Sequence, residues 1–441
     1  MTNEIRNTVR LYRRIRETTS PEQNRDLWIA RSTLLEKNSY RLPRSARSDY
    51  LIGFRVLWRT SKRWFGGSGA IIEGEAASAA VVGGTVANAD VILRYVAASS
   101  GKSSLSFVPR DAIGFQPMAG KLSLLHFLLF AFPIACAAIF NKRRDNLALV
   151  ISSVAEISFV KAYLNFRGLK YVFDFYSFES DSNFMCLALR DQSVRICKIP
   201  SSGPLASHYL KTLTDDLVIS TPYQEEEIVA LGQDILFSNI LRWPPERAHT
   251  YYEKFCLTKP SIPEKVLGFY SHGQWARNLA GHAGYGAGVE EDEIRILTLI
   301  KNYCMNRPDV HVIVYPHPKE LDEKIIARTI EFYDKTLGTD RYELMRLKGG
   351  SAQHFDKVNV AIASYSTIIY ERLYCGMKIL ISGRSKLGFP IENSKLHNIC
   401  FSEQEDFDNK LDVSLNQTTA DFFHHNDLEA YLWNNFPSPL I

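Results

Sequence analysis

Short apolar segments alternate with longer amphipathic segments from residue 147 to residue 382. Strands that alternate with helices form parallel sheets, because each crossover helix returns the chain to the same end of the sheet. The expected strands are residues 147–152, 170–175, 194–199, 216–221, 266–270, 310–315, 358–363 and 378–382. The expected helices are residues 154–166, 205–214, 290–306, 320–337 and 366–376, with one more that begins at Pro222.

A proline-rich segment divides this alternation in two. Residues 242–263 contain Pro244, Pro245, Pro260 and Pro263, and 441 residues suffice for two or three domains. The chain is therefore expected to be an α/β protein with two Rossmann-like, doubly wound domains that face a central cleft. The expected bounds are a basic helical leader at 1–64, a first domain at 65–255, a second domain at 256–418 and a terminal helix at 419–441.

The start of the first domain is built from small residues. Glycines interrupt the chain at 66–69, and residues 70–89 are mostly alanine, valine, glycine and serine. This composition predicts a tight turn and a closely packed helix. Residues 90–96 are rich in β-branched and aromatic side chains and are expected to form a strand.

Charge is distributed unevenly along the chain. Residues 1–64 hold 15 lysines and arginines against 6 acidic residues, whereas the remainder holds 37 against 42. A basic leader of this kind is typical of proteins that contact a membrane surface or nucleic acid. The alternative is a basic helix that is simply exposed to solvent. We expect no nucleic-acid partner, because aromatic residues do not interleave with these charges. With 46% hydrophobic and 23% charged residues, the composition excludes a disordered, collagen-like or polytopic membrane protein.

Residues 122–140 are apolar except for Ser123 and His126. The length approaches that of a membrane span, but Pro133 lies in the middle. We expect a buried or membrane-dipping helix, not a span. The charged first 16 residues do not form a secretory signal, and seven scattered cysteines indicate buried thiols in a reducing cytoplasm.

His317 follows the expected strand 310–315 directly. Ligands of doubly wound sheets bind beyond the carboxyl ends of the strands, so a phosphate-binding imidazole is expected there. The alternative is a histidine that only caps the next helix. Ser364, Ser366 and Thr367 follow strand 358–363, where they could bind phosphate or simply cap a helix. Glu371 lies one turn further on and is a candidate for ribose hydroxyls, or a surface carboxylate.

A third loop follows strand 266–270. Ser271 and Gly273 suit a turn that brings the backbone close to a ligand. Arg277 is a candidate partner for a carboxylate or phosphate. Glycines at 281, 284, 286 and 288 predict a flexible loop over a substrate. An ordinary strand-to-helix connection is the alternative.

The first domain offers an acidic loop after strand 170–175. It contains Asp174, Glu179 and Asp181. Glu179 or Asp181 is the candidate general base, or the nucleophile of a retaining reaction, with a solvated acidic loop as the alternative. The histidines show no metal-ligand spacing and no D-x-D pattern ends a strand, so neither a metal nor a cofactor is expected.

The His-Pro pair at 317–318, followed by Ser-x-Ser-Thr at 364–367, Glu371 and a Cys-Gly pair at 375–376, resembles bacterial surface-polysaccharide glycosyltransferases of the GT-B type. The most similar groups are the sialyl- and polysialyltransferases and the Kdo transferases, which use CMP-activated sugars. The resemblance covers mainly residues 265–385. It implies that His317, Pro318, Ser364, Ser366 and Thr367 bind the nucleotide phosphate. The sialyltransferase acidic motif has a neighbouring glycine that the 174–183 loop lacks.

The resemblance implies a metal-independent transfer of an acidic sugar, of the Kdo or sialic type, from a CMP donor to a surface polysaccharide or lipid-linked glycan. Arg277 would pair with the sugar carboxylate. The leader and residues 122–140 would hold the protein, as a peripheral cytoplasmic enzyme, on the inner membrane. CDP-glycerol phosphotransferases share a similar pattern, so phosphoalcohol transfer is one alternative. A non-catalytic, membrane-associated assembly protein with the same fold is the other.

Overall fold

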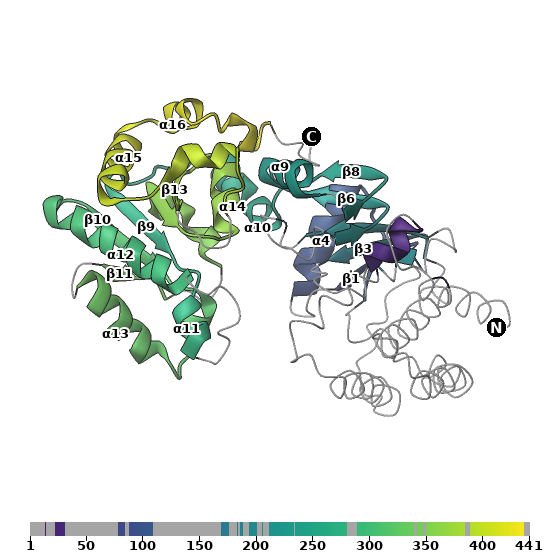
Figure 1. Cartoon of the computed structure of the whole chain (residues 1–441), viewed down its shortest axis with the longest axis horizontal. Helices are drawn as coiled ribbons and strands as arrows, with labels where there is room; N and C mark the ends of the chain where they lie inside the picture. The colour runs from purple at the N-terminus through teal and green to yellow at the C-terminus, as the bar shows by residue number, and fades with distance from the viewer. Residues whose placement is uncertain are drawn as a thin grey trace.

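The structure is a computed structural model. It describes residues 14, 23–30, 78–83, 88–108, 169–175, 183, 186–187, 194–200, 205, 211–232, 234–279, 289–338, 342–346, 350–383 and 389–435. Figure 1 shows two α/β units, one for the earlier part of the chain and one for the later part.

The first unit contains a six-stranded sheet in the order β2-β1-β3-β4-β6-β8. Every pairing in it is parallel. The strands are β1 (Ala79–Gly83), β2 (Leu105–Val108), β3 (Tyr171–Phe175), β4 (Arg195–Ile199), β6 (Asp216–Ile219) and β8 (Asn239–Arg242). A separate parallel pair joins β5 (Lys211–Leu213) to β7 (Asp234–Leu236). Separate apolar clusters lie on the two faces of the larger sheet.

The second unit also contains a six-stranded parallel sheet, in the order β11-β10-β9-β12-β13-β14. Its strands are β9 (Val266–Tyr270), β10 (His311–Tyr315), β11 (Glu343–Leu344), β12 (Val360–Ala363), β13 (Lys378–Ser382) and β14 (Cys400–Phe401). Counted from its first strand, this order is 3-2-1-4-5-6, the order of dinucleotide-binding sheets. The direction of strand addition reverses between β9 and β12, which therefore flank the switch point.

Helices complete both units (Figure 1). The first unit has α4 (Ala89–Ser100) and α9 (Pro222–Leu231), and the connection to the second has α10 (Glu246–Thr250) and the short π-helix η4 (Glu253–Leu257). The second unit has α11 (Gln274–Leu279), α12 (Val289–Asn306), α13 (Ile326–Leu337), α14 (Ile368–Tyr374), α15 (Gln404–Asn416) and α16 (Thr419–His425). Short 3₁₀ helices are η5 (Pro318–Leu321), η6 (Ser351–Lys357), η7 (Lys395–Ile399) and η8 (Glu429–Tyr431).

The two Rossmann-like α/β domains predicted from the sequence are confirmed. The chain passes from the first sheet to the second between β8 and β9, within the proline-rich segment. The domain bounds and the central cleft stay predictions. All four strands expected in the second domain are present, with helices over 289–306, 326–337 and 368–374. Strand β14 and helix α15 were not expected from the sequence.

The prediction for residues 70–96 was wrong in the part that the structure describes. Residues 79–83 form strand β1, and residues 90–96 belong to helix α4. The buried residues of α4 are Ala89, Ile92, Tyr95 and Val96, which recur with a helical period. Strand β1 is buried at every position and so shows no alternation. The strand prediction rested on the β-branched content of residues 90–96. The spacing of the buried residues is what decides between helix and strand, and here it fits a helix.

Three other predicted helices differ from the structure. Within the predicted helix 205–214, residues 211–213 form strand β5, since pairing with β7 overrides local preference. The helix expected at 320–337 begins at Ile326, after the 3₁₀ turn η5, because Glu320 turns inward to cap that turn. Within the terminal helix expected at 419–441, helix α16 ends at His425.

The domains meet through an aromatic side chain of α9. Tyr223 is 1% exposed and packs against Tyr370 of α14 and against Phe389, with ring centroids 5.7 and 5.3 Å away. Its hydroxyl accepts a hydrogen bond from the Ile391 backbone N–H at 3.0 Å. The first domain is therefore seated on the second at a buried, hydrogen-bonded contact.

Several predictions lie outside the described residues. These are most of the leader, the apolar run 122–140, strand 147–152, helix 154–166, the glycine-rich loop 281–288, Glu179 and Asp181. Among the helices that the structure describes, none combines the length and the apolar character that crossing a bilayer requires. The six cysteines in the described part of the chain are buried.

Candidate functional site

The predicted site residues of the second domain lie at the carboxyl ends of three neighbouring strands. Ser271, Gly273 and Arg277 follow β9, His317 and Pro318 follow β10, and residues 364–367 follow β12. Because β9 lies between β10 and β12, the sheet order places these loops side by side. They occupy the switch point, where doubly wound sheets bind ligands.

His317 caps the 3₁₀ turn η5 and lies among the loops at the switch point. Its Nδ1 accepts a hydrogen bond from the Lys319 backbone N–H at 3.2 Å, at the start of η5. Burial lowers the pKa of His317 to about 4, helped by the positive charge of Arg277. The ring is therefore neutral at pH 7. With Nδ1 taken as the acceptor of the Lys319 N–H, the single proton of the neutral ring is assigned to Nε2.

Arg277 meets His317 at that protonated nitrogen. Its Nη2 lies 3.1 Å from His317 Nε2. The guanidinium is always a donor, and Nε2 of this tautomer is a donor as well. In this tautomer neither donor satisfies the other, so one acceptor that contacts both would satisfy the two N–H groups together. Arg277 Nε and His272 Nδ1, buried nearby, have no hydrogen-bond partner within the described part of the chain.

Gly273 allows this approach of the two loops. Its φ is +69°, and a Cβ placed there would lie 2.6 Å from His317 Cβ and 2.8 Å from Cγ. A side chain at residue 273 would therefore displace the imidazole. The approach of this turn to a ligand stays a prediction, and the immediate neighbour of Gly273 in the structure is His317.

Two buried glutamates hold these loops. Glu293 of α12 accepts hydrogen bonds from Ser271 Oγ at 3.1 Å, from the Gln274 N–H at 3.3 Å and from the His272 N–H. Ser271 Oγ also accepts from the Gly273 N–H at 2.9 Å, so its hydroxyl is engaged within the loop. Burial, together with the nearby charge of Glu320, raises the pKa of Glu293 to about 7.

Glu320 holds the loop after β10 through hydrogen bonds of the same kind. Its carboxylate accepts the His317 backbone N–H at 2.5 Å, the Trp275 indole N–H, and the Tyr333 hydroxyl at 3.2 Å. Burial raises its pKa. These contacts fix the backbone of His317 while leaving the imidazole edge directed toward Arg277.

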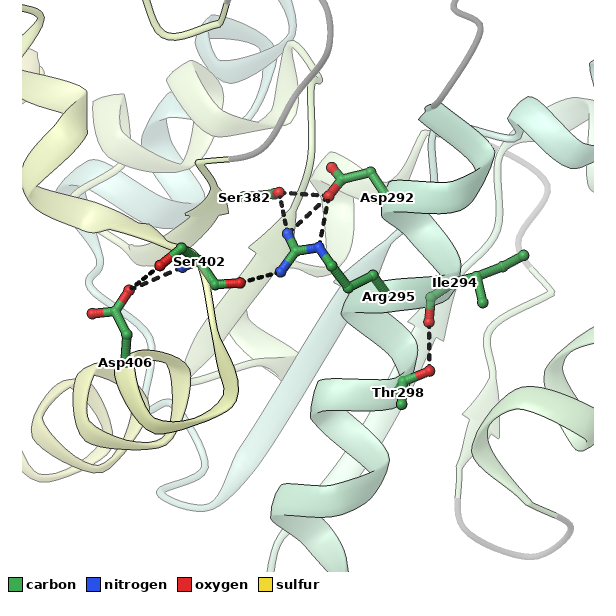
Figure 2. Close-up of polar contacts among 7 residues, drawn as sticks. All are labelled: Asp292, Ile294, Arg295, Thr298, Ser382, Ser402 and Asp406. Atoms are coloured by element: carbon green, nitrogen blue, oxygen red, sulfur yellow. Dashed lines mark hydrogen bonds and ion pairs between the residues drawn. The ribbon is translucent and has the colours of Figure 1, made fainter.

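The residue beside Glu293 supports the other flank of the sheet. Asp292 Oδ1 accepts hydrogen bonds from Ser382 Oγ at 2.7 Å and from Arg295 Nη2 at 2.8 Å. Both contacts are drawn in Figure 2. Arg295 also donates to Ser382 Oγ at 2.6 Å and to the Ser402 carbonyl. The first turns of α12 thus join the ends of β9, β13 and β14.

The loop after β12 brings hydroxyls to the same edge. Ser364 is buried, Ser366 and Thr367 are half-buried, and Ser366 Oγ accepts the Ile368 N–H at 3.4 Å. Glu371 of α14 is 2% exposed, and its Oε2 has no hydrogen-bond partner among the described residues. Burial raises its pKa to about 7, opposed by the charge of Arg247.

Three residues of this site were not among those predicted from the sequence, namely Glu293, Glu320 and His272. Glu320 was detectable, because a capping residue followed three positions later by glutamate is a capping box. Glu293 was not, because it lies 22 residues beyond Ser271 and is brought there by the packing of α12.

No protein-family model matches the chain, and no curated protein matches it.

Solved structures with a similar chain path do exist. UDP-GlcNAc 2-epimerase from Neisseria meningitidis, bound to UDP-GlcNAc, is 13% identical with a TM-score of 0.48, over 81% of this chain and 96% of that one. MurG from Acinetobacter baumannii is 10% identical with a TM-score of 0.41, over 80% and 94%. A mutant O-GlcNAc transferase from Thermobaculum terrenum is 10% identical with a TM-score of 0.40, over 93% and 74%.

Proposed function

We propose that this protein is a glycosyltransferase of the GT-B type that binds the phosphate of a nucleotide-activated sugar at the switch point of its second domain. The preferred donor is a CMP-activated acidic sugar, and the acceptor is a bacterial surface polysaccharide or lipid-linked glycan. The transfer uses no metal and no cofactor. The protein acts at the cytoplasmic face of the inner membrane.

The observation that carries this proposal is the pair of facing donors, Arg277 Nη2 and His317 Nε2, 3.1 Å apart. A phosphate oxygen placed beside the pair, within hydrogen-bond distance of both nitrogens, would accept from both and relieve their mutual repulsion. Donors fixed in advance, within a partly buried site, stabilise the charge that develops on a leaving phosphate. In this proposal Arg277 binds phosphate together with His317, and any contact with a sugar carboxylate is additional.

Glu371 and the 364–367 hydroxyls complete the donor site in this proposal. A buried carboxyl oxygen without a partner favours a ligand that brings a hydroxyl to it. The ribose of a nucleotide carries such hydroxyls. Ser364, Ser366 and Thr367 would contact the phosphate from the β12 side of the switch point.

The first experiment is thermal unfolding of the full chain with CMP, CDP, UDP, GDP, ADP or UDP-GlcNAc. A ligand that binds only the folded protein at 100 times its Kd stabilises it by about 2.7 kcal/mol. We expect CMP to raise the Tm by about 3 °C. A preference for CDP would support phosphoalcohol transfer, and a preference for UDP would keep the enzyme class but change the donor.

The second experiment tests the site with His317→Ala. Loss of one charge-assisted hydrogen bond is expected to weaken nucleotide binding about 10- to 100-fold. His311→Ala is the matched control, since His311 lies at the opposite end of β10 and is exposed. Unchanged affinity in His317→Ala would refute the assignment. No binding of any nucleotide by the wild-type protein would favour a non-catalytic assembly protein.

A further inference from the structure

Two buried glutamates are bonded to the elements that carry the anion site, the position beside Arg277 Nη2 and His317 Nε2. Glu293 is 2% exposed and Glu320 is fully buried. Glu293 accepts the N–H of Gln274 at 3.3 Å, and Gln274 begins α11, the helix that carries Arg277. Glu320 accepts the His317 N–H at 2.5 Å. Each member of this glutamate pair therefore holds the backbone of one of the two donors.

The glutamate pair also meets at one hydroxyl group. Ser271 Oγ lies 3.1 Å from Glu293 Oε1 and is within hydrogen-bonding reach of Glu320 as well. The same oxygen accepts the Gly273 N–H at 2.9 Å. Because a hydroxyl group has one proton, Ser271 can donate to only one of the two carboxyl groups. If the other carboxyl group carries a proton, it can donate to the second lone pair of Ser271 Oγ, and all of these contacts are then satisfied.

The other partners that the structure describes for the glutamate pair are donors. They are the backbone N–H groups of His272, Gln274 and His317, the Trp275 indole N–H and the Tyr333 hydroxyl. Donors favour ionised carboxyl groups, whereas burial and a second carboxylate nearby oppose ionisation. Burial, together with Glu320, raises the pKa of Glu293 to about 7, and burial raises that of Glu320. Two coupled carboxyl groups hold a proton as a pair, and it belongs to neither residue alone.

We infer that the glutamate pair takes up a proton when the phosphate of a nucleotide enters the anion site, so that nucleotide affinity falls as the pH rises. The inference rests on the proposed function and names a regulation of the same site. The phosphate adds negative charge beside His317, whose backbone is bonded to Glu320. The added charge disfavours the fully ionised pair, so the protonated pair binds the anion more tightly. The proton comes from the solvent, and no covalent bond between heavy atoms changes.

Other charged and titratable groups face the glutamate pair from the neighbouring elements. They are His272 and Arg277 after β9, His317 after β10, Tyr333 on α13, and Glu290, Asp292 and Arg295 on α12. Burial lowers the pKa of His272 and that of His317 to about 4, and burial raises the pKa of Tyr333. These three side chains therefore stay neutral from pH 6.5 to pH 8.5. Burial raises the pKa of Glu371, across the switch point, to about 7. Its titration is common to all the variants compared below.

The test is Glu293→Gln, because an amide has the shape of the protonated acid but no proton to lose. CMP is titrated calorimetrically into the full chain from pH 6.5 to pH 8.5, and UDP replaces it if UDP is the stabilising nucleotide. We expect the wild-type Kd to rise about 10-fold more than the variant Kd across this range, from similar values at pH 6.5. The nucleotide phosphate itself titrates near pH 6, but equally for both proteins, so the ratio of the two Kd values isolates the pair.

Glu290→Gln is the matched control. Glu290 lies on the same helix and accepts a hydrogen bond from Asn278 of α11, so its replacement removes a carboxylate from α12 outside the pair. This variant should keep the wild-type dependence on pH. Glu320→Gln removes the other member of the pair and should flatten the profile as Glu293→Gln does, so a folding defect in one variant still leaves a test.

Urea denaturation without nucleotide gives an independent measurement. The pKa of Glu293 is raised in the folded protein, so the stability that its protonated form contributes is lost as the pH rises from about 5 to about 8. Glu293→Gln should lose less stability than the wild type over this range. A wild-type pH profile of CMP affinity in both glutamine variants of the pair would overturn the inference alone. A wild-type protein that binds no nucleotide would overturn the proposed function and this inference together.

Discussion

At the scale of single residues, the candidate site depends on a glycine as much as on charged groups. Gly273 has a left-handed backbone and lies against the His317 ring. Because the imidazole edge is directed by this contact and by Arg277, a methyl group at residue 273 would change the geometry of the facing donors. The chain offers a comparison in Gly101, with φ +67° and nothing within 4 Å of its Cβ position.

We expect Gly273→Ala to weaken nucleotide binding at least about 10-fold, because it displaces His317 from the phosphate position. Both Gly273→Ala and Gly101→Ala pay the backbone strain of about 1–2 kcal/mol for an L-residue in this conformation. Only Gly273→Ala adds the clash. Chemical denaturation and nucleotide titration of the two variants separate these effects, and equal affinities would contradict the expectation.

How far the sequence predicts the site also depends on individual residues. His317 and Arg277 were identifiable because strand ends in a doubly wound sheet are ligand positions. The 3.1 Å contact between Arg277 Nη2 and His317 Nε2 could not be predicted, because it depends on β9 and β10 being neighbours in the sheet and on Gly273. Glu293 reaches its loop through tertiary packing, which no local pattern encodes.

At the scale of elements, α12 organises the carboxyl edge of the second sheet. Glu293 faces the loop after β9, while its neighbour Asp292 faces Ser382 and Arg295 (Figure 2). One helix end thus fixes strands on both sides of β12. The same helix ends in an exposed pair, Arg307 with Asp412.

Replacement of Arg295 by methionine leaves Asp292 buried without its cation. We expect a loss of about 2–4 kcal/mol in the free energy of unfolding, measured by urea denaturation. Arg307→Met removes the exposed pair from the other end of α12 and should cost about 0–1 kcal/mol. Equal losses in the two variants would show that the buried cluster contributes no more than a surface pair.

The elements themselves were predictable where burial has a clear period. The second-domain strands are buried runs flanked by turns, and they lie within a residue or two of their expected positions. The strand prediction for residues 90–96 was wrong because valine and isoleucine favour strands locally, whereas the spacing of Ile92, Tyr95 and Val96 fits a helix. The helix prediction for residues 211–213 was wrong because these residues pair with a strand that lies more than 20 residues further along the chain.

At the scale of the whole molecule, the contact of the domains concentrates on Tyr223. Its ring fills a space between Tyr370 and Phe389, and its hydroxyl accepts the Ile391 N–H. The two-domain organisation followed from the alternation and the proline-rich segment. The contact itself could not be predicted, because aromatic residues occur throughout the sequence.

Tyr223→Ala should remove about 3–5 kcal/mol of packing at the domain boundary. Calorimetry is expected to show a broader or split unfolding transition, since the domains would then unfold with less coupling. Tyr223→Phe keeps the ring and loses only the hydrogen bond, at about 1 kcal/mol, and should preserve a single transition. A single, unshifted transition in Tyr223→Ala would argue that other contacts couple the domains.

The second domain is completed by residues that lie more than 150 positions after its first strand. Trp433 donates its backbone N–H to the Tyr374 carbonyl, and its ring lies 5.5 Å from Tyr252, which precedes the first strand of that domain. Phe422, Phe423 and Tyr431 belong to the same apolar core as Phe255. During synthesis, the first sheet is finished after β8, while the second core stays open until residue 433 has left the exit tunnel. The order of translation thus separates the assembly of the two domains in time.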